Sequence, residues 1–152
     1  MSTPTPTPQN DRELAETFTG CLASAIRQAD RLVASVFDER LREVGLRGTQ
    51  MSLLGMIAKL GRPSQSELAE ATHTDATTLS RNLDRLVERG LAERVACARD
   101  KRVRRYSLTD GGRALLLEAL PHWRAAQREV SDRLGADVCE VLRQLSASLA
   151  KD

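Results

Sequence analysis

The chain has 152 residues, of which 41% are apolar and 29% are charged, with a formal net charge of +2. This length suits one compact domain, or a small domain with helical extensions, and excludes two independent domains. No stretch approaches the roughly 20 apolar residues that cross a bilayer, and the N-terminus lacks the pattern of a signal peptide. We therefore expect a cytoplasmic protein with no membrane partner.

The N-terminal quarter combines a polar tail with a long apolar stripe. Residues 1–10 alternate threonine with proline, which predicts a disordered tail. From Leu14 to Val44 apolar residues recur every three or four positions, which predicts one long amphipathic helix within residues 11–48. Such a helix is roughly 45 Å long, more than a small domain can cover. We therefore expect residues 11–48 to form a dimerisation helix covered by a second chain.

The middle of the chain contains short elements in quick succession. The spacing predicts helices over 49–60, 65–71 and 75–89, the second of them opened by a capping box of Ser64 and Glu67. Two strands, 91–97 and 103–108, follow around a polar loop, and Thr109 caps the next helix. The order predicts a winged helix-turn-helix over residues 49–109, in a fold that is mainly α with a small β-hairpin wing.

The C-terminal region, residues 110–152, carries another apolar stripe between Val130 and Leu149. Pro121 is expected to kink or restart its helix because proline has no N–H to donate, and Gly135 is expected to separate two helices. We interpret these as C-terminal dimerisation helices; an ordinary intramolecular bundle is the alternative.

Positive charge is concentrated in one segment. Residues 76–106 contain nine arginines and lysines against four acids, a net +5, whereas the remainder carries −3. A basic segment in a mildly acidic chain is typical of proteins that bind the phosphate backbone of DNA. A solvated charged surface is the alternative.

The helix predicted over residues 75–89 has the chemistry of a recognition helix. Opposite its leucine stripe it presents hydroxyls and arginines, which can bind bases and phosphates in a major groove. At the hairpin tip, Arg102 can enter a minor groove, and Asp100 can orient an arginine by a charge-assisted hydrogen bond. The full set of candidate DNA-binding residues is Ser64, Gln65, Thr77, Thr78, Ser80, Arg81, Arg85, Arg99, Asp100, Lys101, Arg102 and Arg105.

Several runs of sequence resemble the signature of the MarR (multiple antibiotic resistance regulator) family. They are Gln65–Ala69, Thr77–Leu86, Arg89–Leu91, Asp100–Arg105 and Leu108–Arg113. The resemblance covers roughly residues 41–120; Gly111 departs from it, since many members carry a larger residue there. It implies a homodimer on a palindromic double-stranded DNA operator. Such proteins usually repress genes and are released by a small phenolic or lipophilic effector, or by cysteine oxidation. The resemblance also implies that any effector pocket lies where the N-terminal helix, the 49–60 helix and the helix after Thr109 converge.

The cysteines and the metal-ligand spacing limit the disulfide, metal, redox and catalytic functions that the chain could have. Cys21, Cys97 and Cys139 form no C-x-x-C pair, which argues against a disulfide scaffold or a zinc site. Cys21 is a candidate redox sensor, with a packed apolar role as the alternative. No nucleophile with a base, phosphate loop or metal-ligand spacing is present, so we expect no enzyme, no metal and no cofactor. A winged-helix module for nonspecific DNA binding or protein contacts remains the rival function.

Overall fold

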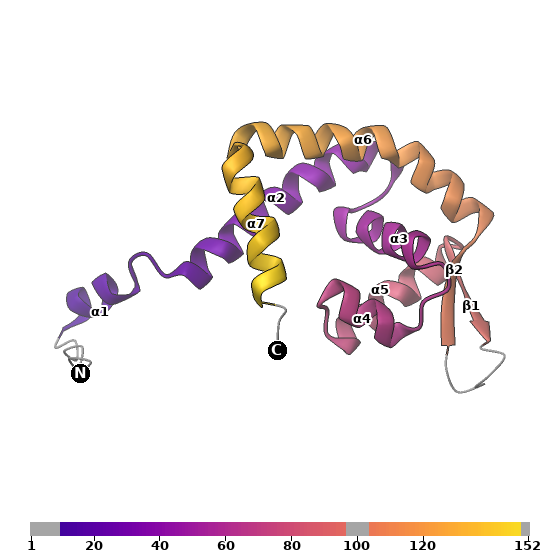
Figure 1. Ribbon diagram of the computed structural model, residues 1–152, viewed down its shortest axis with the longest axis horizontal. Coiled ribbons are helices and arrows are strands. Elements are labelled where there is room, and N and C mark those ends of the chain that lie inside the picture. Colours follow the sequence, from indigo (N-terminus) through magenta and orange to yellow (C-terminus); the bar gives the residue numbers. More distant parts are fainter. Residues whose placement is uncertain (1–9, 97–103, 150–152) are drawn as a thin grey trace. The chain divides into compact units, whose positions relative to one another are not determined.

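The computed structural model describes residues 10–96 and 104–149, which are mostly helical with one two-stranded antiparallel sheet (Figure 1). The prediction of a mainly α fold with a hairpin is confirmed. The chain divides into two compact units, up to Ala34 and from Ser35 onward.

The N-terminal unit corrects the prediction of one long helix. Helix α1 (Asp11–Phe18) ends before Thr19, which is extended, and α2 (Leu22–Leu41) begins only after Gly20, whose φ is +80°. Glycine enters this left-handed region without the Cβ penalty of other residues, so it ends helices readily. The apolar spacing continues across the break, and periodicity alone therefore could not reveal it.

The second unit places the helix-turn-helix on a leucine-rich core. The 3₁₀ turn η1 (Arg42–Val44) is followed by α3 (Gly48–Leu60), α4 (Gln65–Thr72) and α5 (Ala76–Glu88). The predicted capping box is confirmed: Ser64 Oγ accepts from the Glu67 N–H, and the Ser64 N–H donates to Glu67. The inward residues of these elements include Leu41, Leu46, Met51, Leu53, Leu54, Ile57, Leu68, Leu79, Leu83 and Leu86.

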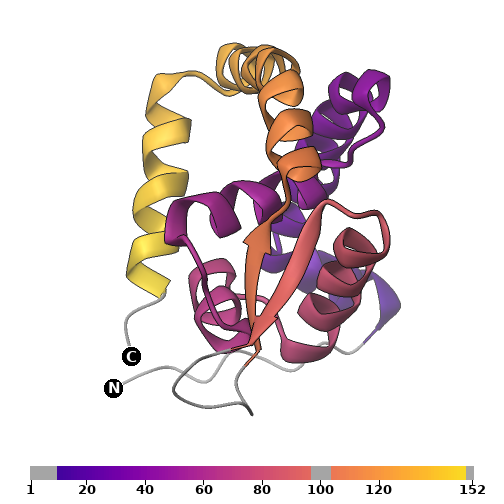
Figure 2. The same ribbon diagram turned by 90° about the vertical axis from the view of Figure 1, so that its right-hand side faces the viewer.

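The wing strands extend this core. Strand β1 (Ala92–Ala96) pairs antiparallel with β2 (Arg104–Leu108) (Figure 2). In this register Arg94 lies opposite Tyr106. Tyr106 is only 2% exposed, and its N–H donates to the Pro63 carbonyl at 2.9 Å. The hairpin is therefore fixed to the segment that opens α4.

Two helices complete the unit. Thr109 caps α6 (Asp110–Leu134) by accepting from the Gly112 N–H, and Gly135 separates α6 from α7 (Ala136–Leu149), both as predicted. The expectation that Pro121 restarts the helix is wrong: α6 runs through it and bends along its course (Figure 1). Pro121 is exposed, so water can satisfy the carbonyl that its missing N–H leaves free. No helix in the described ranges is long and apolar enough to cross a membrane.

Candidate nucleic-acid interface

Helix α5 has a structured start and a firmly packed inner face. The Asp75 carboxylate accepts from the N–H groups of Thr77 and Thr78, at 3.1 and 2.9 Å. Leu79, Leu83 and Leu86 are buried along the opposite side. The first turn is therefore held in a defined position, which is a requirement for reading bases.

The cap also shifts the titration of Asp75. Hydrogen bonds from the backbone N–H and the hydroxyl of Thr78, and from the backbone N–H of Thr77, lower the pKa of the Asp75 carboxyl. The anion is the form that accepts these bonds and that interacts favourably with the helix N-terminus. The cap is therefore charged at neutral pH.

The outer face of α5 carries most of the predicted contacts. Thr77, Thr78, Arg81 and Arg85 are exposed, and Ser80 is half-buried. Arg81 and Arg85 form no ion pair with any acid in the described ranges, so their guanidinium groups are available to a ligand. The structure therefore brings these five predicted residues together on one helix.

Three other predicted residues are occupied by internal contacts. Ser64 is only 6% exposed and its hydroxyl caps α4. Gln65 Nε2 donates to the Ala76 carbonyl at 3.4 Å, which ties α4 to the start of α5. Arg105 Nη1 donates to the Arg62 carbonyl at 2.6 Å and to Glu67 at 3.2 Å. These contacts make Ser64, Gln65 and Arg105 positioning residues of the helix-turn-helix and wing.

The tip of the wing belongs to the sequence-based predictions alone. Arg99, Asp100, Lys101 and Arg102 lie outside the described residues, as does Cys97. The described part of the hairpin ends at Ala96 and Arg104, of which Arg104 is exposed.

An ion pair that the sequence did not reveal joins the wing to α5. The Arg94 guanidinium on β1 donates to the Asp84 carboxylate on α5. Asp84 is not among the residues for which the sequence predicts a role. The pairing arises because the Arg94 side chain on β1 faces α5. That orientation depends on how the strand packs against the helix, and the apolar spacing of the sequence does not reveal it.

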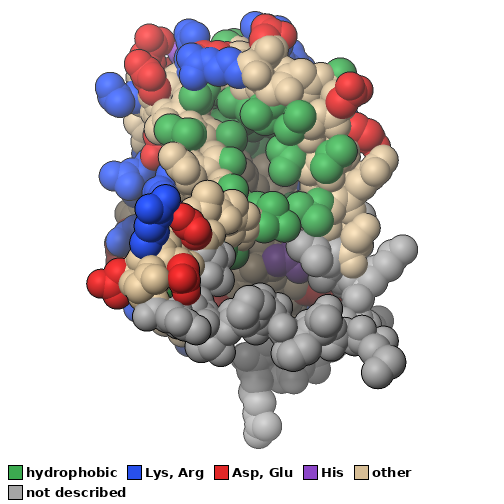
Figure 3. All heavy atoms as spheres, turned by 90° about the vertical axis from the view of Figure 1, so that its left-hand side faces the viewer, with side chains coloured by type: hydrophobic (Ala, Val, Ile, Leu, Met, Phe, Trp, Pro, Cys, Tyr) green, Lys and Arg blue, Asp and Glu red, His purple; other side chains and the backbone are tan. Residues whose placement is uncertain are grey.

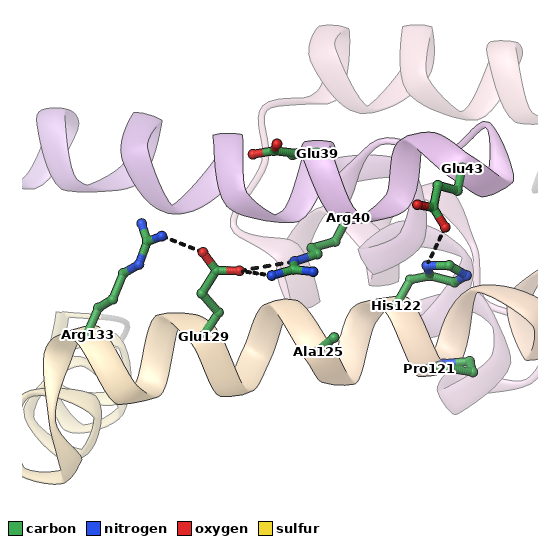
Figure 4. A pocket seen from close by; sticks show the side chains of 8 residues that line it. All are labelled: Glu39, Arg40, Glu43, Pro121, His122, Ala125, Glu129 and Arg133. Carbon is green, nitrogen blue, oxygen red and sulfur yellow. Dashed lines mark hydrogen bonds and ion pairs between the residues drawn. The ribbon is translucent and has the colours of Figure 1, made fainter.

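A charged pocket of about 590 Å³ lies between the end of α2 and α6 (Figure 4). Glu129 accepts from Arg40 at 2.7 Å and also pairs with Arg133, and His122 Nδ1 lies 3.6 Å from Glu43. In Figure 4 both guanidinium groups point toward Glu129. Its lining residues come from α2, η1 and α6; none of those described comes from α3, unlike the convergence that the resemblance implied.

Cys21 immediately precedes α2, and its carbonyl accepts from the Ala25 N–H at 3.0 Å. Hydrogen bonds from the backbone N–H and hydroxyl of Ser24 lower the pKa of the Cys21 thiol.

Among the described residues, no group of three or more histidines, cysteines or acids is placed to hold a metal ion.

Comparisons with known proteins agree with this geometry. A MarR family model matches residues 44–103. The Mycobacterium tuberculosis transcriptional regulator MosR, solved in complex with DNA, is 37% identical, with 86% of this chain and 93% of that chain covered at a TM-score of 0.76. A probable transcriptional regulator from Pseudomonas aeruginosa is 32% identical, with coverage of 87% and 98% and a TM-score of 0.77. A mutant Escherichia coli MarR, complexed with operator DNA, is 26% identical, with coverage of 86% and 94% and a TM-score of 0.76.

Proposed function

Because the chain belongs to the MarR family, we propose that it is a transcriptional regulator that binds a palindromic operator in double-stranded DNA as a homodimer. The observation that carries this proposal is the exposed face of α5, where the threonines of a capped first turn are followed by arginines without acidic partners in the described ranges. The solved complexes of MosR and MarR with DNA support it. The chain then acts by binding in the cytoplasm, where bacterial DNA lies, and not as an enzyme.

In this proposal Thr77, Thr78, Ser80, Arg81 and Arg85 meet the major groove. Arg81 can bond bidentately to guanine, and the threonine methyls can contact thymine. Arg99, Lys101 and Arg102 reach the adjacent minor groove with Asp100 as their orienting partner. Ser64, Gln65 and Arg105 support this surface through the contacts described above, which leave part of the Arg105 guanidinium for a phosphate.

We further propose repression, relieved by a small phenolic or lipophilic molecule. An effector that favours one spacing of the two recognition helices lowers the affinity for an operator with half-sites about one helical turn apart. The support is the family resemblance, and a panel of phenolic acids added to the operator complex tests it. An unchanged Kd across the panel contradicts release by this class.

The test of DNA recognition is a footprint on the intergenic DNA next to the gene, followed by anisotropy titrations on the protected duplex and on a random duplex. We expect Arg81→Ala to raise the Kd for the protected duplex roughly tenfold, because one bidentate base contact is lost. Arg102→Ala should weaken binding strongly while fold and dimer persist. Arg128→Ala, which removes an exposed arginine of α6, is the matched control and should change little.

The same titrations, repeated at several salt concentrations, separate the rival functions. Equal affinity for the two duplexes indicates nonspecific packaging. Binding to neither duplex indicates a module for protein contacts and overturns the proposal.

A second candidate, a redox-responsive repressor of the same fold, is favoured by Cys21, a partly exposed free thiol whose pKa the hydrogen bonds from Ser24 lower. A thiolate attacks a peroxide and becomes a sulfenic acid, while the peroxide is reduced to water or an alcohol. Peroxide should then release the operator from the native chain and not from Cys21→Ser. Equal release from both chains contradicts a sensing role for Cys21.

A further inference from the structure

A second pocket, of about 510 Å³, lies where the end of α2, η1, the start of α3 and the end of α5 meet. Three arginines line it: Arg42 from η1, Arg47 from the residue before α3, and Arg89 from the residue after α5. This volume falls in the range of small-molecule sites. The lining residues come from four elements, so the arginines converge on one concave site and are not isolated side chains on a single helix.

The charge in this pocket is unbalanced. The acid that lines it, Asp38, already accepts from the Gly48 N–H at 2.7 Å. Within residues 10–96 and 104–149, no carboxylate forms an ion pair with Arg42, Arg47 or Arg89. The pocket of Figure 4 is the opposite case, since three acids, Glu39, Glu43 and Glu129, line it with two arginines, and Glu129 pairs with both of them. Three cations against one anion leave a net +2 that attracts a counter-ion into a concave site.

One of the arginines is held in place. Arg89 Nη2 donates to the Gly45 carbonyl at 2.9 Å, and Nη1 donates to Gln50 Oε1 at 3.1 Å. The same Gln50 oxygen accepts from the Arg47 N–H, also at 3.1 Å. These bonds use two of the five N–H donors of Arg89 and fix the plane of its guanidinium. A positioned fork of donors matches the two oxygens of a carboxylate or phosphate.

We propose that Arg42, Arg47 and Arg89 form a binding site for a small oxyanion, either a carboxylate or a phosphate. A base in the major groove is not the occupant, because Arg89 follows the last residue of α5, whereas four of the five proposed reading residues lie on its first two turns and only Arg85 lies on its last. The 13 residues of α5 span about 20 Å. The site is therefore at the far end of the recognition helix, and its existence does not depend on the proposed function.

The test is isothermal titration calorimetry of the full chain in a buffer free of phosphate and carboxylates, with inorganic phosphate and citrate as separate probes. We expect one site per chain for at least one probe, and the probe that binds identifies the head group. Arg42→Gln and Arg47→Gln should each weaken that binding about tenfold or more, because a charge-assisted hydrogen bond is lost. Arg128→Gln removes the same charge outside the pocket and should leave the affinity unchanged.

Unfolding curves of the variants, followed by circular dichroism, keep the result interpretable. Arg42 and Arg47 are exposed and neither side chain bonds another described residue, so both variants should melt like the native chain. Absence of binding by both probes up to about 10 mM overturns the proposal. So does an equal loss in Arg128→Gln, which would show a response to net charge and not to this site.

Discussion

Gly112, the third residue of α6, lies against the backbone of Leu91. A Cβ built on Gly112 would come 1.8 Å from the Leu91 carbonyl oxygen and 2.7 Å from its carbon. These are backbone atoms, so the junction of hairpin and helix must move to admit a methyl group. We expect Gly112→Ala to lower the free energy of unfolding by about 3 kcal/mol, measured by urea denaturation.

Gly111 provides the matched control for that substitution. Its added Cβ would meet nothing closer than 3.7 Å, and alanine removes the conformational entropy of a helical glycine. Gly111→Ala should therefore stabilise the chain by about 0.5 kcal/mol. Equal destabilisation by both substitutions would refute the close approach as the cause.

Asp75 gives a pH dependence with a definite sign. Its folded pKa is lowered, so its contribution to stability is complete above the pKa of the unfolded chain, about 3.9. That contribution is lost as the pH falls through the lower folded value. At pH 7 Asp75→Ala should reduce the melting temperature by about 3 °C, because two N–H groups lose their acceptor.

Asp75→Asn separates the contribution of the N-cap hydrogen bonds to stability from the contribution of the negative charge. Asparagine keeps the accepting oxygen, so this variant should retain most of the stability while losing the pH dependence assigned to Asp75. If Asp75→Ala and the native chain lose stability in parallel between pH 5 and pH 3, the assignment is wrong.

At the scale of single residues, the sequence predicted roles that depend on neighbours in the chain. The Ser64–Glu67 capping box and the Thr109 cap are confirmed because both are local patterns. The contacts of Arg105 with Arg62 and Glu67 span about forty residues, and no local pattern contains them. The same holds for the requirement of Gly112, which depends on Leu91.

At the scale of elements, the Asp84–Arg94 ion pair connects the recognition helix to the wing. Both side chains are partly exposed, so the pair adds little to global stability. Its role in the proposed function is to hold two DNA-contacting elements in one relative orientation. Asp84→Asn should therefore leave the melting temperature nearly unchanged and weaken operator binding about fivefold.

The sign of this effect distinguishes orientation from charge. Removing an acid near DNA strengthens binding on electrostatic grounds alone. Glu88→Gln, which removes an exposed acid further along α5, should show that slight gain in an anisotropy titration. A gain of the same size for Asp84→Asn would contradict the orienting role.

Element boundaries were predictable where a residue acts at the boundary itself. Gly135 ends α6 as predicted. Gly20 interrupts the N-terminal stripe, which the apolar spacing did not predict, and Pro121 lies within a bent α6, which fits the predicted kink and not the predicted restart. A glycine in a periodic segment and a proline on an exposed helical face leave the apolar spacing intact, so the outcome depends on packing and solvation.

At the scale of the whole molecule, apolar side chains remain exposed in both units. Phe18 and Leu22 are exposed in the N-terminal unit, as are Val138 and Val141 on α7. Hydrophobic side chains are visible at the surface on the face that Figure 3 shows. Exposed apolar surface of this extent is typical of an interface between chains, which supports the proposed dimer.

The dimer gives a prediction at this scale. Val141 is 60% exposed, so Val141→Asp should barely affect folding of the single chain but place a charge in the interface. We expect a monomer at micromolar concentration by size exclusion with light scattering, since an unpaired buried charge is strongly unfavourable. Ala136→Asp at the start of α7, and deletion of residues 1–10, should both leave the dimer intact.

Because α6 is one continuous helix, a movement at one of its ends is transmitted to the other. One end follows directly from the wing strand β2, the other reaches Gly135 before α7, and its 25 residues measure about 37 Å along the bent axis. A rigid-body tilt of about 5° at the α7 end therefore displaces the wing end by at most about 3 Å. A small rotation at the interface between two copies can thus displace the wing relative to a DNA groove while every helix stays folded.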